Sequence, residues 1–458
     1  MADRRDLTEG SVRGHLFRLG APMIVGIIGV LSISLADAYF LGRLGTGPLT
    51  AISFTFPVVL TLQSLGIGLS AGAASVASRA IGAGRTDRAR RLATDAVLLS
   101  VLVVLVLTAV GLVVVRPLFA LLGAEGAVLD DVVAYMRIWF FGLPFLVVPM
   151  VANGLIRASG DGVAPSAIMV VAALINVGLD PVLIYGLGPF PSLEIEGAAW
   201  ASLASRVVTF VLAVGILALR ERLLTFTIPP VADVLSSWGE VLRVGAPAAL
   251  STSVNPLAIT VITGALSRFG DDTVAAFGVA TRIEALACVP LLALSAAIGP
   301  VAGQNWGAER SGRVREALAL SFWTSAGWAV VLAGFFFAFG DAIARLFTAE
   351  PSVVAGVARY LRITAFSLVG YGVVVTASAA FNATGRAGEG LGMTTLRSAA
   401  LYVPFALVGA SLGAASYAYV GIAAANVLSG SVVAWWALSR TRARARLQGA
   451  GVAGTRPA

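Results

Sequence analysis

The chain has 458 residues, of which 58% are hydrophobic and 12% are charged. A soluble domain carries about 25% charged residues, so this composition excludes a soluble globular protein. The net charge is +8, but every basic residue is arginine and the arginines gather between apolar segments, which argues against a nucleic-acid surface. Cys288 is the only cysteine and His15 the only histidine, which excludes an internal disulfide, a zinc site built from these residues and a Ser–His–Asp triad.

Apolar segments recur along the whole chain, and each is long enough to cross a bilayer as a helix of about 20 residues. They do not alternate apolar and polar residues as the strands of a membrane barrel do. The sequence therefore predicts an all-α integral membrane protein with twelve transmembrane helices. The predicted spans, in chain order, are 18–41, 50–77, 93–115, 131–153, 163–187, 196–219, 239–264, 275–300, 317–339, 357–381, 391–412 and 419–440.

The arginine-rich connections alternate along the chain, so all of them lie on one side of the membrane. They precede the first span, join spans two and three, six and seven, and eight and nine, and follow the last span. The positive-inside rule places this side in the cytoplasm. We therefore expect a multi-pass protein of the cell inner (plasma) membrane with both termini cytoplasmic.

Residues 18–91 and 243–316 are two copies of one pattern, in which Pro22 matches Pro247 at a spacing of 225 residues. Further pairs at this spacing are Gly82 with Gly307, Arg85 with Arg310, and Ala158 with Ala383. Such a repeat predicts two pseudo-symmetric six-helix bundles and is typical of transporters, whose two bundles rock around a central cavity. The expected divisions are an N-terminal cytoplasmic tail 1–15, an N-terminal bundle 16–222, a cytoplasmic linker 223–240, a C-terminal bundle 241–440 and a disordered cytoplasmic tail 441–458.

Four ionisable side chains stand out within the predicted spans, where such groups are costly and therefore candidates for function. They are Asp37, Asp180, Arg206 and Glu284. With a rise of 1.5 Å per residue, the first three lie at or just outside the membrane midplane. We expect these three to form one polar cluster in the first half of the chain.

Asn176 and Asp180 are spaced i, i+4, so they share one face of the fifth span. Pro181 follows directly; it has no N–H and can kink the helix, which frees carbonyl oxygens. A carboxylate, an amide oxygen and free carbonyls suit Na⁺, and a carboxyl group removed from water can also take up H⁺ near neutral pH. Pro22 precedes Asp37 in the first span and offers a hinge. The alternative for Asn176, Asp180 and Asp37 is a satisfied polar contact between helices.

Arg206 and Glu284 each have two interpretations. Arg206 either balances Asp37 or Asp180 or makes a purely structural pair. Glu284 is either a substrate carboxylate in the second half or the partner of an arginine.

With these residues assembled, the chain resembles the MATE (multidrug and toxic compound extrusion) family over about residues 15–440. The resemblance rests on motifs in both halves: Pro22 with Asp37 and segment 41–45, segment 82–85, Asn176 with Asp180 and Pro181, segment 244–247, segment 303–308, and segment 382–385. It implies two six-helix bundles in a V, a central cleft and alternating access. It also implies export of cationic or amphipathic organic compounds in exchange for H⁺ or Na⁺.

Within that family, Asp37, Asn176 and Asp180 match the first-bundle cation site of the DinF-like branch. Segment 357–381 has no carboxylate, which disfavours the second-bundle arrangement of the NorM-like branch. DinF-like members can use a threonine of span six, but this chain has serines there, of which Ser202 is a secondary cavity candidate. The resemblance implies that a cation neutralises Asp37 and Asp180, bends span one near Pro22 and displaces the drug.

We therefore predict a secondary active multidrug exporter and not an enzyme. Its expected partners are small drug-like molecules and membrane lipids, with no nucleic acid and no cofactor beyond the transported H⁺ or Na⁺, and a single chain is expected to function as a monomer. One alternative is a flippase for lipids or lipid-linked oligosaccharides of the same superfamily. The other is a membrane-embedded enzyme, for which Asp37 with Asp180 is the only carboxylate dyad.

Overall fold

The computed structural model describes residues 6–44, 46–225 and 230–453. Throughout this part of the chain the regular structure is helical, without a β-strand. The described chain separates into two compact units. Unit 1 contains Pro22–Ile81 and Arg85–Ala249, and unit 2 contains Asp6–Ala21, Gly82–Gly84 and Leu250–Ala458.

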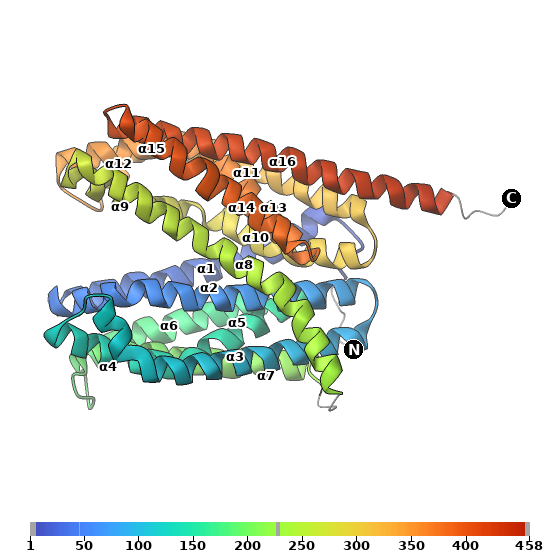
Figure 1. Ribbon diagram of the computed structural model, residues 1–458, viewed down its shortest axis with the longest axis horizontal. Helices are drawn as coiled ribbons and strands as arrows, with labels where there is room; N and C mark the ends of the chain where they lie inside the picture. Colours follow the sequence, from blue (N-terminus) through green and yellow to red (C-terminus); the bar gives the residue numbers. More distant parts are fainter. Residues whose placement is uncertain (1–5, 45, 226–229, 454–458) are drawn as a thin grey trace. The chain divides into compact units, whose positions relative to one another are not determined.

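The helices follow one another with short connections, and within each unit they run side by side (Figure 1). The first half of the chain forms α1 (Val12–Gly42), α2 (Thr46–Gly82), α3 (Thr86–Leu121), α4 (Gly126–Phe141), α5 (Leu143–Ala158), α6 (Val163–Tyr185), α7 (Glu194–Gly215) and the π-helix η1 (Ile216–Arg220). The second half forms α8 (Val231–Leu266), η2 (Ser267–Phe269), α9 (Asp271–Ala287), α10 (Val289–Gly307), α11 (Ser311–Arg345), α12 (Pro351–Thr364), η3 (Ala365–Ser367), α13 (Leu368–Ala383), α14 (Ala387–Thr395), the π-helix η4 (Leu396–Tyr402), α15 (Val403–Ser411) and α16 (Ala415–Ala453).

The predicted all-α membrane architecture is confirmed. In the described part of the chain, ten helical segments are long and apolar enough to cross a membrane, and two bent helix pairs bring the number to twelve. The pairs are α4 with α5 and α9 with α10, each bent by 44°. In both pairs the second helix carries a proline in its first turn, and this residue cannot donate to the carbonyl four positions earlier.

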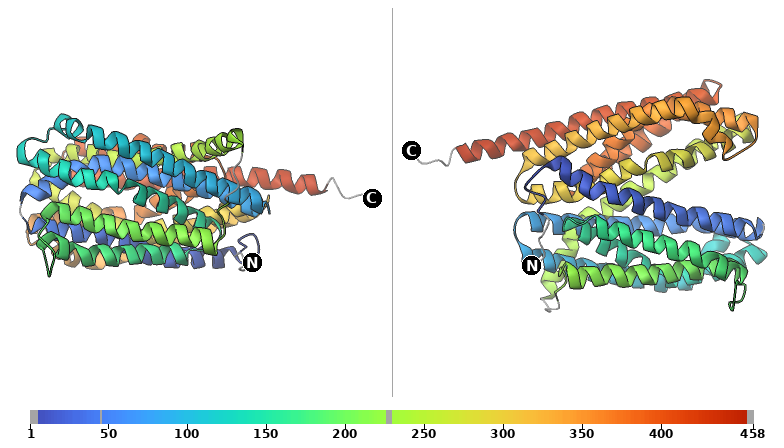
Figure 2. Two further views of the ribbon diagram at one scale, coloured as in Figure 1. Left: turned by 90° about the horizontal axis from the view of Figure 1, so that it is seen from below. Right: turned by 180° about the vertical axis from the view of Figure 1, so that it is seen from behind.

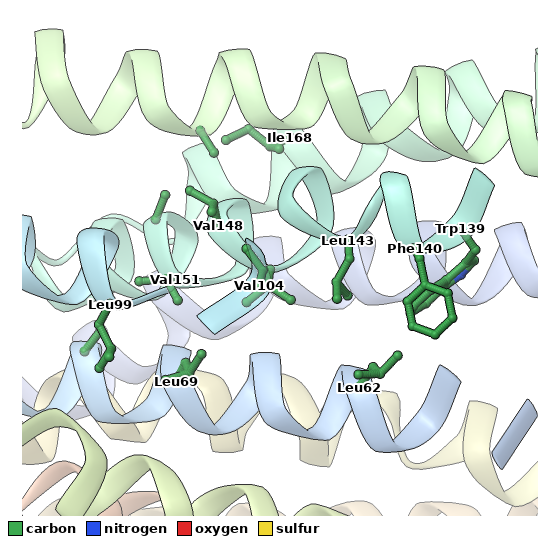
Figure 3. Packing of buried hydrophobic residues seen from close by; sticks show 14 of the residues in the cluster. Leu62, Leu69, Leu99, Val104, Trp139, Phe140, Leu143, Val148, Val151 and Ile168 are labelled. Atoms are coloured by element: carbon green, nitrogen blue, oxygen red, sulfur yellow. The ribbon is translucent and has the colours of Figure 1, made fainter. Parts of the chain in front are cut away.

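The interior of unit 1 is filled by side chains from α2, α3, α4, α5 and α6, which point into the same space (Figure 3). Leu62, Leu69, Val104 and Leu143 are examples of buried residues in this cluster. Large apolar side chains on the outer faces remain exposed, such as Val113 of α3 at 80%. In a bilayer these outer side chains contact lipid, so the bundle is held together by close packing and polar contacts rather than by exclusion of water.

The boundaries of the units differ from the predicted bundle limits of 16–222 and 241–440. Leu7, Val12, Leu16 and Leu19 pack with apolar residues of α10 and α11, which is why residues 6–21 belong to unit 2. The predicted linker 223–240 overlaps the start of α8, and Trp238 of this helix donates a hydrogen bond to the Asp95 carbonyl oxygen at 2.9 Å in unit 1.

The first part of the segment 441–458, for which a disordered tail is expected, is helical in the structure. α16 continues as one helix to Ala453 and extends beyond the other helices of unit 2 (Figures 1 and 2). The sequence from 441 to 453 is rich in arginine, alanine and leucine, which have high helix propensity. Residues 454–458 and 1–5, which fall in the two predicted tails, lie outside the described residues.

Candidate functional site

The polar residues predicted in the first half come together inside unit 1. Asp37 lies on α1, Asn176 and Asp180 on α6, and Ser202 and Arg206 on α7. Asn176 and Asp180 are fully buried and Ser202 is nearly so. The side chains of one i, i+4 face of α6 thus meet residues of two other helices.

Small residues allow these helices to approach closely. A Cβ added at Gly197 of α7 would lie 2.5 Å from the Leu183 carbonyl oxygen of α6. Between α1 and α6, a Cβ at Gly26 would lie 3.0 Å from the Ser166 Cα. Only glycine fits at the first of these positions, because real Cβ atoms essentially never come so close to a backbone oxygen. Close packing of this kind is typical of membrane helices.

Several oxygen atoms in the site have no hydrogen-bond donor. The Asn176 side-chain amide donates from Nδ2 to the Ser202 hydroxyl at 3.2 Å. Among the described residues, Asn176 Oδ1, both carboxylate oxygens of Asp180 and Asp37 Oδ1 are buried without a hydrogen-bond partner. Buried polar atoms are normally paired, so four unpaired oxygens in one place form an unusual acceptor-rich site.

The Asp37 and Asp180 carboxyl groups lie within hydrogen-bonding range of each other. Two ionised carboxylates are acceptors only, so they repel each other unless a proton or a cation lies between them. Such a pair takes up and releases protons as one coupled unit. The geometry is therefore suited to binding H⁺, or to supplying oxygen ligands to a small hard cation such as Na⁺.

Arg206 lies close enough to Asp37 and Tyr135 to interact with them electrostatically. Its guanidinium stacks over the Trp139 ring, with 5.0 Å from Cζ to the ring centroid. Within the described chain, no carboxylate oxygen lies within ion-pair distance of Arg206, so it balances the aspartates through space rather than by direct pairing. The sequence pattern did not indicate the contribution of α4, which supplies Tyr135 and Trp139.

Neither candidate hinge interrupts its helix. α1 runs through Pro22 and α6 runs through Pro181 as single α-helices. The Ser166 hydroxyl of α6 donates a hydrogen bond to the Pro22 carbonyl oxygen of α1, which links the two helices at the hinge position. At the other end, the Tyr185 hydroxyl donates to the Phe40 carbonyl oxygen at 2.7 Å.

Glu284 lies apart from this site, on α9 in unit 2, where the Tyr360 hydroxyl donates to its Oε2 at 2.7 Å. Arg397 of unit 2 is near enough to interact with Glu284 electrostatically. Sequence reasoning overlooked Arg397, although the signal was present: it is an arginine inside the predicted span 391–412. Over the described ranges, no group of three or more His, Cys, Asp or Glu residues forms a metal-binding cluster.

Comparison with known proteins decides the family. The family model described as MatE matches residues 22–182 and 247–408, which includes both copies of the repeat. The chain belongs to the MATE family. Members of this family are transporters, so the chain is a membrane transporter and not an enzyme.

Two relatives illustrate the range of this family. A protein of Shewanella oneidensis described as an FAD transporter is 35% identical over 430 residues, which cover 94% of this chain and 95% of that protein. A probable multidrug resistance protein of Bacillus subtilis, YoeA, is 28% identical over 346 residues, covering 75% of this chain and 74% of the relative.

Solved structures of MATE proteins share the fold. A crystal structure of MATE in the straight conformation superimposes with a TM-score of 0.91 at 27% identity, covering 97% of this chain and 100% of the other. An outward-facing multidrug resistance MATE transporter gives a TM-score of 0.89 at 27% identity, covering 97% of this chain and 99% of the other. The predicted family and fold class are thus confirmed.

Proposed function

We propose that this MATE protein is a secondary active exporter of small organic compounds in an inner (plasma) membrane, with both termini cytoplasmic, driven by H⁺ or Na⁺ bound at Asp37, Asn176 and Asp180. This is the cation site expected for the DinF-like branch. The proposal rests on one observation: the two carboxyl groups are in contact, and the surrounding oxygens lack donors. Such a site is incomplete until a proton or cation enters it.

The mechanism follows from the charge of the pair. A proton or Na⁺ entering from outside removes the repulsion between Asp37 and Asp180 and lets α1 and α6 approach each other at this level. Pro22 leaves one carbonyl of the preceding turn without its helical hydrogen bond, so α1 bends there at low cost and the compound is displaced. The membrane potential favours the inward movement of each positive charge by about 2.3 kcal/mol of free energy per 100 mV.

The exported compounds are proposed to be cationic or amphipathic and drug-like, because several relatives are described as multidrug resistance or multidrug export proteins. A second candidate is an anionic dinucleotide, because the relative at 35% identity is described as an FAD transporter and matches along 94% of this chain.

The test uses purified protein in liposomes loaded with the fluorescent cation ethidium. A pH gradient and a Na⁺ gradient are imposed in separate experiments, and dye movement is recorded for wild type and Asp180→Asn. Dye movement driven by one gradient and lost in the variant supports the proposal and identifies the ion. Asp130→Asn is the matched control, because Asp130 is an exposed carboxylate that pairs with Arg116 at 3.0 Å.

Two results would count against the proposal. If Asp180→Asn transports like wild type, the carboxylate pair is not the coupling site. If folded wild-type protein moves dye under neither gradient, the compound class is wrong, and labelled FAD and labelled lipids are tested next in the same liposomes.

A further inference from the structure

A second polar cluster lies inside unit 2 and is centred on Arg397 of the π-helix η4. Only 3% of this residue is exposed. Its Nε donates to Asn426 Oδ1 at 2.9 Å, and its Nη1 donates to Asn255 Oδ1 at 3.0 Å and to the Ser398 hydroxyl at 3.3 Å. The side chain is therefore fixed by groups from three helices, α8, η4 and α16.

Two aromatic rings enclose the guanidinium. Its Cζ lies 4.7 Å from the centroid of the Tyr371 ring and 5.1 Å from that of Tyr402, both within the range of a cation–π contact. Arg397 and Tyr402 are five residues apart, and a π-helix brings residues at this spacing together because its hydrogen bonds run from i to i+5. Pro404, which cannot continue the regular α-helical bonding of the preceding turn, explains why the helix widens at this point.

The charge of Arg397 is not paired directly. In the part of the chain that the structure describes, no carboxylate oxygen lies within 4.0 Å of the guanidinium, and Nη2 donates to no acceptor. Glu284 interacts with it only at longer range, and its Oε2 already accepts from Tyr360. Glu284 thus offsets part of the positive charge but does not occupy the free donors.

A fixed arginine with unused donors is expensive inside a membrane, and residues of this kind usually mark a substrate or ion pathway. Its free Nη2 can donate charge-assisted hydrogen bonds to the oxygens of a phosphate group. Asn255 and Tyr371 at the edge of the cluster are partly exposed, whereas Arg397 between them is 3% exposed. The neutral asparagine ligands orient the fork without neutralising it.

We propose that the Arg397 cluster, defined as Arg397, Asn255, Asn426, Tyr371 and Tyr402, binds an anionic phosphate group of a transported compound. This inference rests on the proposed transport function and favours its second candidate, the anionic dinucleotide, because it specifies the substrate class as phosphate-bearing organic compounds. A dinucleotide such as FAD is the test compound, since a relative at 35% identity is described as its transporter. The cluster lies in unit 2, whereas the cation site lies in unit 1, so the two can be tested separately.

The experiment measures equilibrium binding to purified full-length protein by flavin fluorescence anisotropy. FAD and riboflavin are compared, because they share the flavin ring and differ by the pyrophosphate and nucleoside. Wild type is expected to prefer FAD, and inorganic pyrophosphate is expected to displace it. Arg397→Gln should weaken FAD binding roughly 10- to 100-fold, the range for loss of charge-assisted hydrogen bonds, without changing riboflavin binding. Arg397→Lys should be intermediate, because it keeps the charge but loses the planar guanidinium that the two asparagines orient.

Arg282→Gln is the matched control, since it removes an exposed arginine from α9 of the same unit and should leave the preference for FAD unchanged. Equal affinity of wild type for FAD and riboflavin would overturn the proposal without any variant. Retention of the preference in Arg397→Gln would also overturn it, as would displacement of FAD by phosphatidylglycerol but not by pyrophosphate, which indicates a lipid headgroup. If Arg397→Gln does not fold, Asn255→Ala replaces it, with loss of the preference expected again.

The two hypotheses fail in different ways. Ethidium movement driven by an ion gradient tests the proposed function, and it is expected to be lost in Asp180→Asn and kept in the control Arg282→Gln. If wild-type protein shows no gradient-driven ethidium movement, the proposed exporter function is rejected, even if the protein binds FAD. Normal gradient-driven ethidium movement without phosphate-dependent binding would reject only the proposal that the Arg397 cluster binds phosphate.

Discussion

The buried polar groups of the two units have opposite character. In unit 1, Asp37 and Asp180 present acceptor oxygens that lack donors, whereas in unit 2 Arg397 presents a cation whose acceptors are neutral. The repeat itself does not carry these groups: at the spacing of 225 residues, Asp37 corresponds to Ile262, and Glu284 corresponds to Val59. Duplication thus preserved the helical scaffold, while each copy acquired its own buried chemistry.

A buried tyrosine is common to both copies. Tyr135 and Tyr360 stand at matching positions, and each lies beside the charged groups of its own unit. In unit 2 the tyrosine hydroxyl donates a hydrogen bond to Glu284. In unit 1 the residue that matches Glu284 is a valine, and the tyrosine is near enough to Asp37 and Asp180 to interact with them electrostatically. The same residue therefore supports two different charge arrangements.

The largest expected effect tests whether ion coupling belongs to unit 1 alone. Asp37→Asn should abolish gradient-driven ethidium movement in liposomes, because it removes one member of the carboxylate pair. Glu284→Gln should keep most of this movement, because its carboxylate already has a hydrogen-bond partner. Equal loss in both variants would show that the two units share the coupling role.

Adding a side chain at a close contact between helices should destabilise both units to a similar extent. Gly197→Ala places a Cβ 2.5 Å from the Leu183 carbonyl oxygen, and Gly421→Ala places one 2.2 Å from the Phe405 carbonyl oxygen. Each should destabilise the protein by roughly 3 kcal/mol, the upper end for overpacking, because helix backbone cannot move aside. Thermal unfolding followed by circular dichroism in detergent measures this, with Gly215→Ala, which meets no atom within 4 Å, as the control.

Substitution of the shared tyrosine should destabilise the two units unequally, and by less than the glycine substitutions do. Tyr360→Phe removes a hydrogen bond to a buried carboxyl group and should cost about 2 kcal/mol. Tyr135→Phe should cost about 0.5 kcal/mol or less, since within the described residues its hydroxyl makes no hydrogen bond. Urea titrations of the two variants compare these values, and equal losses would contradict the contrast between the units.

The smallest effect concerns the N-terminal segment of unit 2. Burial raises the pKa of Asp6, but hydrogen bonds from Thr8 and the nearby charges of Arg310 and His15 outweigh it, so the pKa lies below its usual 3.8. A lowered folded-state pKa stabilises the protein above the unfolded value, and this contribution is lost as pH falls through the folded value. The Tm difference between wild type and Asp6→Asn should therefore be small at pH 7 and vanish in acid.

The sequence predicted the spans and the cluster in unit 1 because both depend on simple helix geometry. The length of an apolar run sets a span, and the i, i+4 spacing of Asn176 and Asp180 sets a common face. The depth of Asp37 and Arg206 along their spans then placed them at the same level. Whether these residues couple ion and substrate stays a prediction until the transport experiments are made.

Simple helix geometry could not predict the Arg397 cluster from the sequence. Its contacts depend on a π-helix that brings Tyr402 over Arg397, and on asparagines from α8 and α16. A sequence pattern based on 3.6 residues per turn does not reveal the i to i+5 spacing of a π-helix. The limits of the compact units likewise depend on tertiary packing, here of residues 6–21, which hydropathy does not reveal.

The division of the chain into units has a consequence for its two halves when they are separated. The boundaries fall next to Pro22 in α1 and next to Pro247 in α8, so each unit contains the first turns of the helix that opens the other half. A half of the chain cut between α7 and α8 therefore lacks part of its own compact unit and carries the first turns of a helix that belong to the other unit. Separately expressed halves should therefore assemble only when they are produced together.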